Sequence, residues 1–358
     1  MEPLKVWFKR TFSDPQVVIL AVFLVVGALV IFGLGRMLAP VFTSIVFAYL
    51  LEAVVQRCQK LGMARTPAVT LVFLLFMAVL VFLILVLVPM LARQLTRLVQ
   101  QFPNYLSQGQ ALLQELPTRY PKLITEVQLQ AVFADLSSEM GRWGQRLLSL
   151  SLASVVNIVG LLIFLVLVPV LVFFFLKDKQ KLIDWFVGFL PRERHLVTSV
   201  WIEVEGQIAN YVRGKAGEIV IVGAVTYFTF VSLGLQYSVL LATLTGFSVL
   251  IPYVGAAVVT LPIALLAYFQ FGWGWDFGSV MIAYAIIQAL DGNVLVPLMF
   301  SEVVNLHPIA IIVAILVFGG LWGFWGVFFA IPLATVVQAV IKAWPRQVEP
   351  STEPDAPV

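Results

Sequence analysis

Residues 280–300 read VMIAYAIIQALDGNVLVPLMF, a run that is long and apolar enough to cross a lipid bilayer. Its middle is interrupted by polar or helix-perturbing residues, namely Gln288, Asp291, Gly292, Asn293 and Pro297. A carboxylate at membrane depth is costly unless it faces a partner or a water-filled cavity. The stretch therefore predicts a membrane span that binds or moves something polar, and not an inert anchor.

The composition agrees with a membrane protein. The chain of 358 residues is 61% hydrophobic and 11% charged, with a mean hydropathy of +1.00, whereas soluble domains carry about 25% charged residues. The net charge of +3 is too small to indicate a nucleic-acid partner. We expect an all-α, polytopic membrane protein with no nucleic-acid partner.

Enzymatic motifs are missing from the sequence. Cys58 is the single cysteine, which excludes an intrachain disulfide, and the only histidines, His195 and His307, are far apart along the chain. No P-loop, GxSxG or HExxH pattern occurs. We therefore expect no enzyme, no metal site and no cofactor.

The apolar stretches indicate about eight transmembrane segments, with broken or re-entrant helices in the C-terminal half. They are 17–34, 37–55, 67–90, 152–176, 217–271 (two or three segments), 276–300 and 308–341. Two stretches, 238–251 and 308–320, are short enough to be half-length or re-entrant.

The division of the chain follows from these stretches. The predicted segments are spans 1–3 in 1–90, an extramembrane helical arm in 91–150, span 4 in 151–176, a cytoplasmic amphipathic linker helix in 177–215, a transport core in 216–342 and a disordered cytoplasmic tail in 343–358. Lys and Arg are concentrated in the loops on the side of the N-terminus. The positive-inside rule then predicts that both termini are cytoplasmic, in a bacterial inner membrane.

The predicted arm and linker are both amphipathic. Apolar residues repeat at alternating spacings of four and three from Leu91 to Leu116 and from Leu129 to Leu150, with Pro117 and Pro121 between them. The two helices of the arm either pack as a hairpin, on each other or on neighbouring subunits, or lie on the membrane surface. The same spacing in 197–211 indicates a helix that either couples the two membrane halves or only anchors at the interface.

A backbone break is predicted at 251–255, which reads IPYVG. Pro252 has no N–H to donate, Tyr253 follows it, and Gly255 permits unusual dihedral angles. Broken backbone inside a bilayer survives only where protein or a cavity satisfies it, and transporters use such breaks as binding sites. The alternative is a plain loop at the membrane face.

Three carboxylates lie in or beside predicted spans. Gln288 and Asp291 are three residues apart and share a helical face, so Asp291 can coordinate a cation, take a proton or bind substrate hydroxyls. The alternative is a carboxylate at the cytoplasmic mouth that pairs with a lysine or arginine. Glu52 and Glu218 are expected to pair with Arg57 and Lys215, respectively.

Two further motifs follow near the C-terminus. In Leu306-His307-Pro308, Pro308 suits the first position of a helix, and His307 either caps or lines an entrance or relays protons. The run 319–326, GGLWGFWG, is followed by Pro332. Its small residues permit close helix contact, whereas its tryptophans are typical of an interfacial belt.

This ordered set of motifs resembles the autoinducer-2 exporter family, also called PerM-like permeases. The matching elements are Leu176-Lys177-Asp178, Tyr211-Val212-Arg213-Gly214, Ile251-Pro252-Tyr253-Val254-Gly255, Pro262, Gln288…Asp291-Gly292-Asn293…Pro297, Leu306-His307-Pro308 and Gly319…Gly323…Gly326…Pro332. The resemblance implies secondary transport or export of small molecules, with coupling to protons or sodium, and a homo-oligomer.

Three functions are compatible with these observations. The leading one is secondary transport or export of a small polar metabolite or signalling molecule such as autoinducer-2. The second is a monovalent cation/proton antiporter that uses Asp291, and the third is a membrane scaffold whose outer arm recruits a partner. The expected partners are a small-molecule substrate, H+ or Na+, the lipid bilayer and further copies of the chain.

Overall fold

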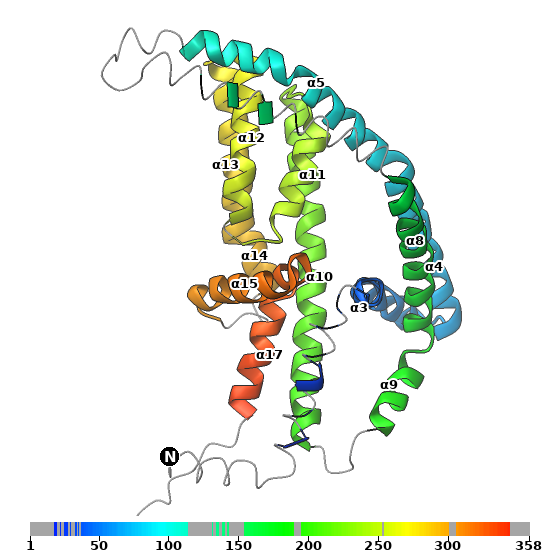
Figure 1. Cartoon of the computed structure of the whole chain (residues 1–358). Helices are drawn as coiled ribbons and strands as arrows, with labels where there is room; N and C mark the ends of the chain where they lie inside the picture. Colours follow the sequence, from blue (N-terminus) through cyan, green and yellow to red (C-terminus); the bar gives the residue numbers. More distant parts are fainter. Residues whose placement is uncertain are drawn as a thin grey trace, which may run out of the picture. The chain divides into compact units, whose positions relative to one another are not determined.

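The computed structural model describes residues 37–113, 154–189, 195–252, 254–300 and 306–343, together with isolated residues in 18–35 and 131–142 (Figure 1). Every regular element in this part of the chain is helical, as predicted. Six of these helices are long and apolar enough to span a membrane, and three shorter apolar helices accompany them. The predicted first span at 17–34 lies largely outside the described residues.

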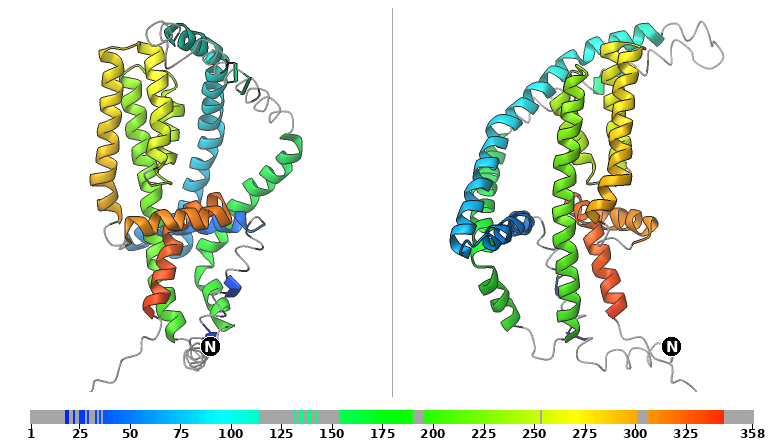
Figure 2. Two further views of the ribbon diagram at one scale, coloured as in Figure 1. Left: turned by 60° about the vertical axis from the view of Figure 1, so that its left-hand side comes forward. Right: turned by 180° about the vertical axis from the view of Figure 1, so that it is seen from behind.

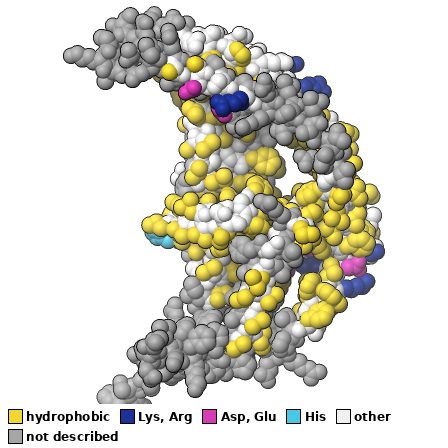
Figure 3. Space-filling view, in the orientation of Figure 1, with side chains coloured by type: hydrophobic (Ala, Val, Ile, Leu, Met, Phe, Trp, Pro, Cys, Tyr) yellow, Lys and Arg dark blue, Asp and Glu magenta, His cyan; other side chains and the backbone are white. Residues whose placement is uncertain are grey.

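The chain forms two compact units. One contains Pro40–Lys177 and Gly214–Met299, and the other contains Met1–Ala39, Asp178–Arg213 and Phe300–Val358. We call them the core unit and the terminal unit. Figure 3 shows one face of the molecule, on which hydrophobic side chains cover the helices and charged side chains are few.

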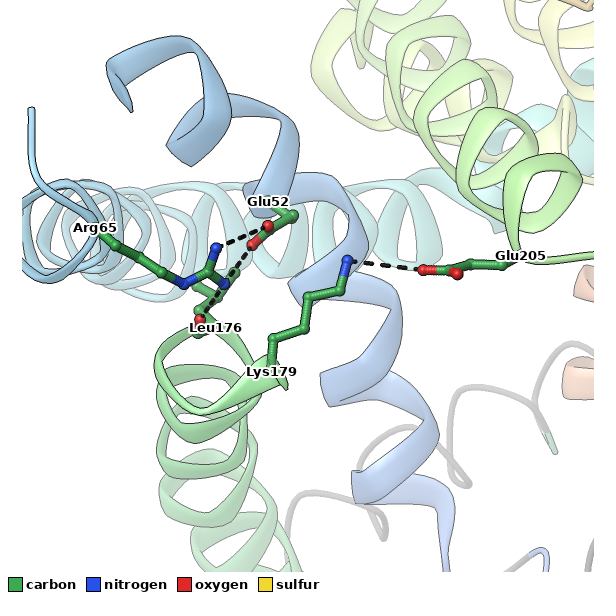
Figure 4. Close-up of polar contacts among 5 residues, drawn as sticks. All are labelled: Glu52, Arg65, Leu176, Lys179 and Glu205. Atoms are coloured by element: carbon green, nitrogen blue, oxygen red, sulfur yellow. Dashed lines mark hydrogen bonds and ion pairs between the residues drawn. The ribbon is translucent and has the colours of Figure 1, made fainter. Parts of the chain in front are cut away.

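In the core unit, three helices pack through branched aliphatic side chains. They are α3 (Ala39–Lys60), α4 (Arg65–Phe82) and α8 (Ser154–Lys177), and Val55, Val69 and Val172 are buried between them. Arg65 joins all three, because its guanidinium contacts Glu52 of α3 at 3.4 Å and donates to the Leu176 carbonyl of α8 at 2.8 Å (Figure 4). The predicted partner of Glu52, Arg57, was therefore wrong.

The third span continues without a break into the arm. After α4, the π-helix η1 (Leu83–Leu87) leads into α5 (Val88–Leu113). Pro89 directly follows the widened turn, and a proline ring clashes with the carbonyl four residues earlier in a regular α-helix. The Val88 N–H instead reaches the Leu83 carbonyl, five residues back. The second predicted stripe, 129–150, lies outside the continuously described ranges.

The first stripe of the arm packs on the core unit itself. Leu98 and Tyr105 contact the cluster that includes Phe230 and Leu241. The Gln101 Oε1 accepts hydrogen bonds from Tyr105 at 2.9 Å and from Tyr237 at 2.6 Å. Burial raises the pKa of Tyr237 to about 12, so its phenol remains a donor at physiological pH.

The predicted linker helix does not end before the next span. The short α9 (Lys179–Gly188) is followed by α10 (His195–Ser232), a single helix of 38 residues. The segment therefore continues past 215 into apolar sequence with no helix end. Within the terminal unit, Lys179 of α9 and Glu205 of α10 form an ion pair at 3.7 Å (Figure 4).

The C-terminal half of the core unit is built on α10. The short helix α11 (Ser238–Ser248) crosses it where Gly246 meets Gly223, since a Cβ on Gly246 would lie 2.8 Å from the Ile219 carbonyl oxygen. Then follow α12 (Val254–Phe271) and α13 (Trp275–Leu290), which contact each other and lie close together in Figure 2. The π-helix η2 (Asp291–Leu295) and α14 (Val296–Phe300) complete this half.

The last apolar stretch is divided into three helices in the terminal unit. They are α15 (Pro308–Trp322), α16 (Phe324–Phe328) and α17 (Ala330–Ala343). Gly323 has a φ of 60° and ends α15, and a Cβ on Gly326 would collide with the Phe318 carbonyl. These glycines allow the tight reversal between α15 and α16, so 308–341 is not one straight span.

Candidate polar site between α10, α11 and α13

A buried ion pair lies on α10 where that helix enters apolar sequence. Lys215 and Glu218 are 5% and 2% exposed, and the Lys215 Nζ lies 2.8 Å from the Glu218 Oε2. Their spacing of three residues places both on one helical face. The predicted pairing of Glu218 with Lys215 is confirmed.

The same ammonium group also binds the end of α11. The Lys215 Nζ donates to the Val249 carbonyl at 2.8 Å, and Val249 is the C-cap residue of α11. Carbonyls at a helix C-terminus carry partial negative charge and attract cations. Lys215 therefore holds the start of the predicted 251–255 break against α10.

Asp291, the C-cap residue of α13, completes the group. Lys215 interacts electrostatically with Asp291, and Asp291 does so with Glu218. Apolar contacts fix this arrangement, because Val222 of α10, Val249 and Ile287 of α13 pack in one cluster. We call Lys215, Glu218, Gln288 and Asp291 the polar cluster.

Two atoms of the polar cluster are buried without a partner. Neither the Asp291 Oδ1 nor the Gln288 Nε2 forms a hydrogen bond with any described residue. Buried polar atoms without partners are rare and costly. An acceptor and a donor one helical turn apart thus have no hydrogen-bond partner among the described protein groups.

The π-helix shapes this part of the site. Asp291 is its first residue, and the Val296 N–H bonds to the Asp291 carbonyl, five residues back, directly before Pro297. A π-turn widens the helix and rotates the residues that follow it, and such turns are frequent at functional sites. Gly292 lies in the same turn, with open space where a Cβ would be.

The backbone break lies beside the cluster. Pro252 is in the turn between α11 and α12, and Gly255, the second residue of α12, lies so close to Ser248 that a Cβ would collide with the Ser248 carbonyl. The Tyr284 hydroxyl of α13 donates to the Ala256 carbonyl at 3.1 Å. Tyr253 lies outside the described residues.

Two predicted pathway residues make local contacts instead. The Asn293 amide is exposed and donates to the Ala289 carbonyl at 2.8 Å. The exposed His307 caps α15, where its Nδ1 accepts from the Ile309 N–H at 3.3 Å and Pro308 takes the first helical position. This geometry agrees with the capping alternative for His307.

The remaining motif residues make local hydrogen bonds or close helix contacts. Arg213 donates to the Ala209 carbonyl at 2.9 Å and to the Asn210 side chain at 2.6 Å, and Gly214 is buried. Gly319 faces Val327, and the Pro332 carbonyl accepts from Thr335 at 2.7 Å.

The sequence reasoning gave Lys215 and Glu218 no functional weight. Their signal was present, since a lysine and a glutamate three residues apart begin a long apolar stretch. The Val249 carbonyl carried no signal, because every residue has one. Among the described residues, no group of three His, Cys, Asp or Glu side chains could hold a metal ion.

Comparison with known proteins places these features in context. The family described as "AI-2E family transporter" matches residues 2–346. The chain is 47% identical to "Putative permease PerM" of Escherichia coli over 345 residues, which covers 96% of this chain and 98% of that protein. It is 26% identical to "Putative transport protein YueF" of Bacillus subtilis over 306 residues, 84% of this chain and 82% of that one.

Proposed function

The chain belongs to the AI-2E transporter family, and from this premise we propose that it is a secondary transporter that exports a small polar metabolite or signalling molecule, such as autoinducer-2, through the polar cluster. The observation that carries the proposal is the pair of unpartnered buried atoms, the Asp291 Oδ1 and the Gln288 Nε2. A hydroxylated solute can donate to the first and accept from the second, which matches a small polar substrate.

The proposed mechanism follows from the free-energy cost of a charged carboxylate in apolar surroundings. A carboxylate in an apolar surrounding is tolerated when a partner compensates its charge. The solute, a proton or Na+ at Asp291 supplies that compensation, so occupancy and charge at Asp291 are coupled. The backbone break at 251–255 follows the Val249 carbonyl that Lys215 binds, and we infer that it is the part of the site that changes with occupancy.

The test is efflux from proteoliposomes that contain the full chain and are loaded with autoinducer-2. Asp291→Asn should reduce the rate at least tenfold, since it removes the negative charge, while Asp291→Glu should retain part of it. The matched control is Asp276→Asn, because Asp276 is an exposed carboxylate in the first turn of the same helix. Wild-type efflux from Asp291→Asn liposomes would reject Asp291 as the centre of the pathway.

A cation/proton antiporter is the second candidate, and the two carboxylates around one lysine favour it. In the same liposomes, an Na+ gradient should then drive proton movement with no organic solute present. That result together with no autoinducer-2 flux would favour the antiporter.

A scaffold function has less support. The arm residues that it would need for a partner, Leu98 and Tyr105, contact the chain's own core unit. A scaffold would show neither flux. We also propose a homo-oligomer, and native mass spectrometry in mild detergent should show more than one copy; monomers alone would contradict it.

A further inference from the structure

The charges of the polar cluster do not cancel. Two carboxylates, Glu218 and Asp291, interact with a single ammonium group, that of Lys215. With all three ionised, the cluster carries one negative charge among the apolar side chains of Val222, Val249 and Ile287. Asp291 is partly buried, and an uncompensated charge in apolar surroundings is unfavourable.

Lys215 directly contacts one of the two carboxylates, that of Glu218. The Lys215 Nζ makes a direct 2.8 Å contact with the Glu218 Oε2 and another with the Val249 carbonyl. The Asp291 Oδ1 accepts no hydrogen bond from any described group. The unmatched negative charge therefore resides at Asp291.

We propose that the polar cluster takes up one monovalent positive charge, a proton or Na+, at Asp291, and that Lys215 sets this number at one by serving as a built-in counter-ion for Glu218. The inference rests on the transport function proposed above and specifies its coupling. Without the lysine, two carboxylates would face each other and two positive charges would be needed.

The other groups around Asp291 do not change this count. From α10 they are Lys215 and Glu218, and from α13 they are Gln288 and Tyr284, whose hydroxyl bonds to Ala256 and Thr260 of α12. From α11 the cluster meets the Val249 carbonyl. Among the described groups around Asp291, Lys215 and Glu218 are thus the other ones that can carry a charge.

The test counts charges and needs no transported solute. The purified full chain in nanodiscs is examined in Na+-free buffer near neutral pH by infrared spectroscopy, which measures the carbonyl band of carboxylic acids that stay protonated where exposed carboxylates are ionised. A second arm measures the number of bound radioactive Na+ ions per chain near neutral pH. Protonation identifies the proton as the charge, whereas saturable Na+ binding identifies the metal ion.

We expect one equivalent for the wild type, in one arm or the other, and none for Asp291→Asn. Lys215→Met should take up two. The double variant Lys215→Met with Glu218→Gln should return to one, because it removes both members of the buried pair, and it also controls for misfolding of the single variant. Lys215→Arg should remain at one, as should Asp276→Asn.

A count of one in Lys215→Met, or a wild-type count of zero or two, would overturn the inference. These counts are independent of autoinducer-2 flux. The expected counts without autoinducer-2 flux would reject the proposed substrate and leave the charge assignment intact. Flux with other counts would support the substrate and reject the charge assignment.

Discussion

Arg65 stabilises the junction of three helices through a single side chain. It contacts Glu52 at 3.4 Å and donates to the Leu176 carbonyl at 2.8 Å, and its side chain is 38% exposed. Partial exposure weakens the ion pair through solvent screening. The bond to the carbonyl, which holds the end of α8, is then the larger contribution.

Arg65→Met should consequently destabilise the protein more than Glu52→Gln does. Glu52→Gln keeps an oxygen acceptor for Arg65 and leaves the Leu176 bond in place, whereas Arg65→Met removes both contacts. We expect losses of about 1–2 kcal/mol and below about 1 kcal/mol, respectively. Thermal unfolding in detergent compares them, and an equal decrease in Tm would show that the ion pair dominates.

Gly255 is a residue at which even a methyl group should be harmful. Its missing Cβ faces the Ser248 carbonyl, a backbone atom that cannot rotate away, so Gly255→Ala should destabilise the protein by about 1–3 kcal/mol. Gly278→Ala is the matched control in α13, where open space surrounds the site and alanine should be neutral or stabilising. A similar Tm for the two variants would contradict the close approach.

The contacts of a single residue could be predicted from the sequence when helical spacing alone determined them. Lys215 and Glu218 are three residues apart on one helix, so their pairing was predictable. Arg57 and Glu52 are five residues apart, which places them on different faces of α3. Arg65 reaches Glu52 only because the chain reverses around Gly62, whose φ is 94°, and no helical spacing contains that information.

At the scale of elements, two helices widen for the same reason. Each π-helix ends two residues before a proline, η1 before Pro89 and η2 before Pro297. The residue directly before each proline bonds five residues back, which leaves the carbonyl four residues before the proline clear of the ring. We predicted spans across both regions but not these turns, because apolar periodicity does not resolve a shift of one residue.

The polar contacts of the arm provide a test at this scale. Gln101→Leu removes the acceptor of Tyr105 and Tyr237 and should speed hydrogen exchange in the 233–237 turn about tenfold, if about 1–1.5 kcal/mol is lost. The control is Gln100→Leu, the exposed neighbour on α5. Equal exchange in both variants would mean that Leu98 and the ring stacking of Tyr105 on Phe269 hold the arm alone.

The heptad-like stripe predicted that the arm is helical and packs. The identity of its packing partner was not predictable, because a stripe of apolar residues does not specify which surface it packs against. The structure places the contacts at the turn between α10 and α11, more than 120 residues away along the chain.

For the whole molecule, hydropathy predicted a membrane protein of many helices, and the number of its spans stays a prediction. About eight spans were expected, and six long apolar helices are described, with three shorter ones at 238–248, 308–322 and 330–340. The span expected at 17–34 lies largely outside the described residues, and the apolar stretch 308–341 is divided at Gly323. Hydropathy measures how apolar a segment is, but it does not show where the backbone of that segment turns.

Topology is the prediction that belongs to this scale. In a Cys58→Ser background, single cysteines at Ser107 of α5 and Thr198 of α10, both exposed, should react with an impermeant thiol reagent from opposite sides of the membrane. The reason is the concentration of basic residues in loops on the side of the N-terminus. Labelling of both from one side would contradict the predicted orientation.

The π-turn at Asp291–Leu295 also affects how relatives should be read. A widened turn accommodates one residue more than an α-helix of the same length would. Deletion of a single residue between 291 and 295 would let the helix return to regular winding and still leave it long enough to cross the bilayer. A related sequence with a one-residue gap there would keep the membrane span, but its carboxylate would no longer be oriented by a π-turn. A deletion of one residue would then be enough to change the function.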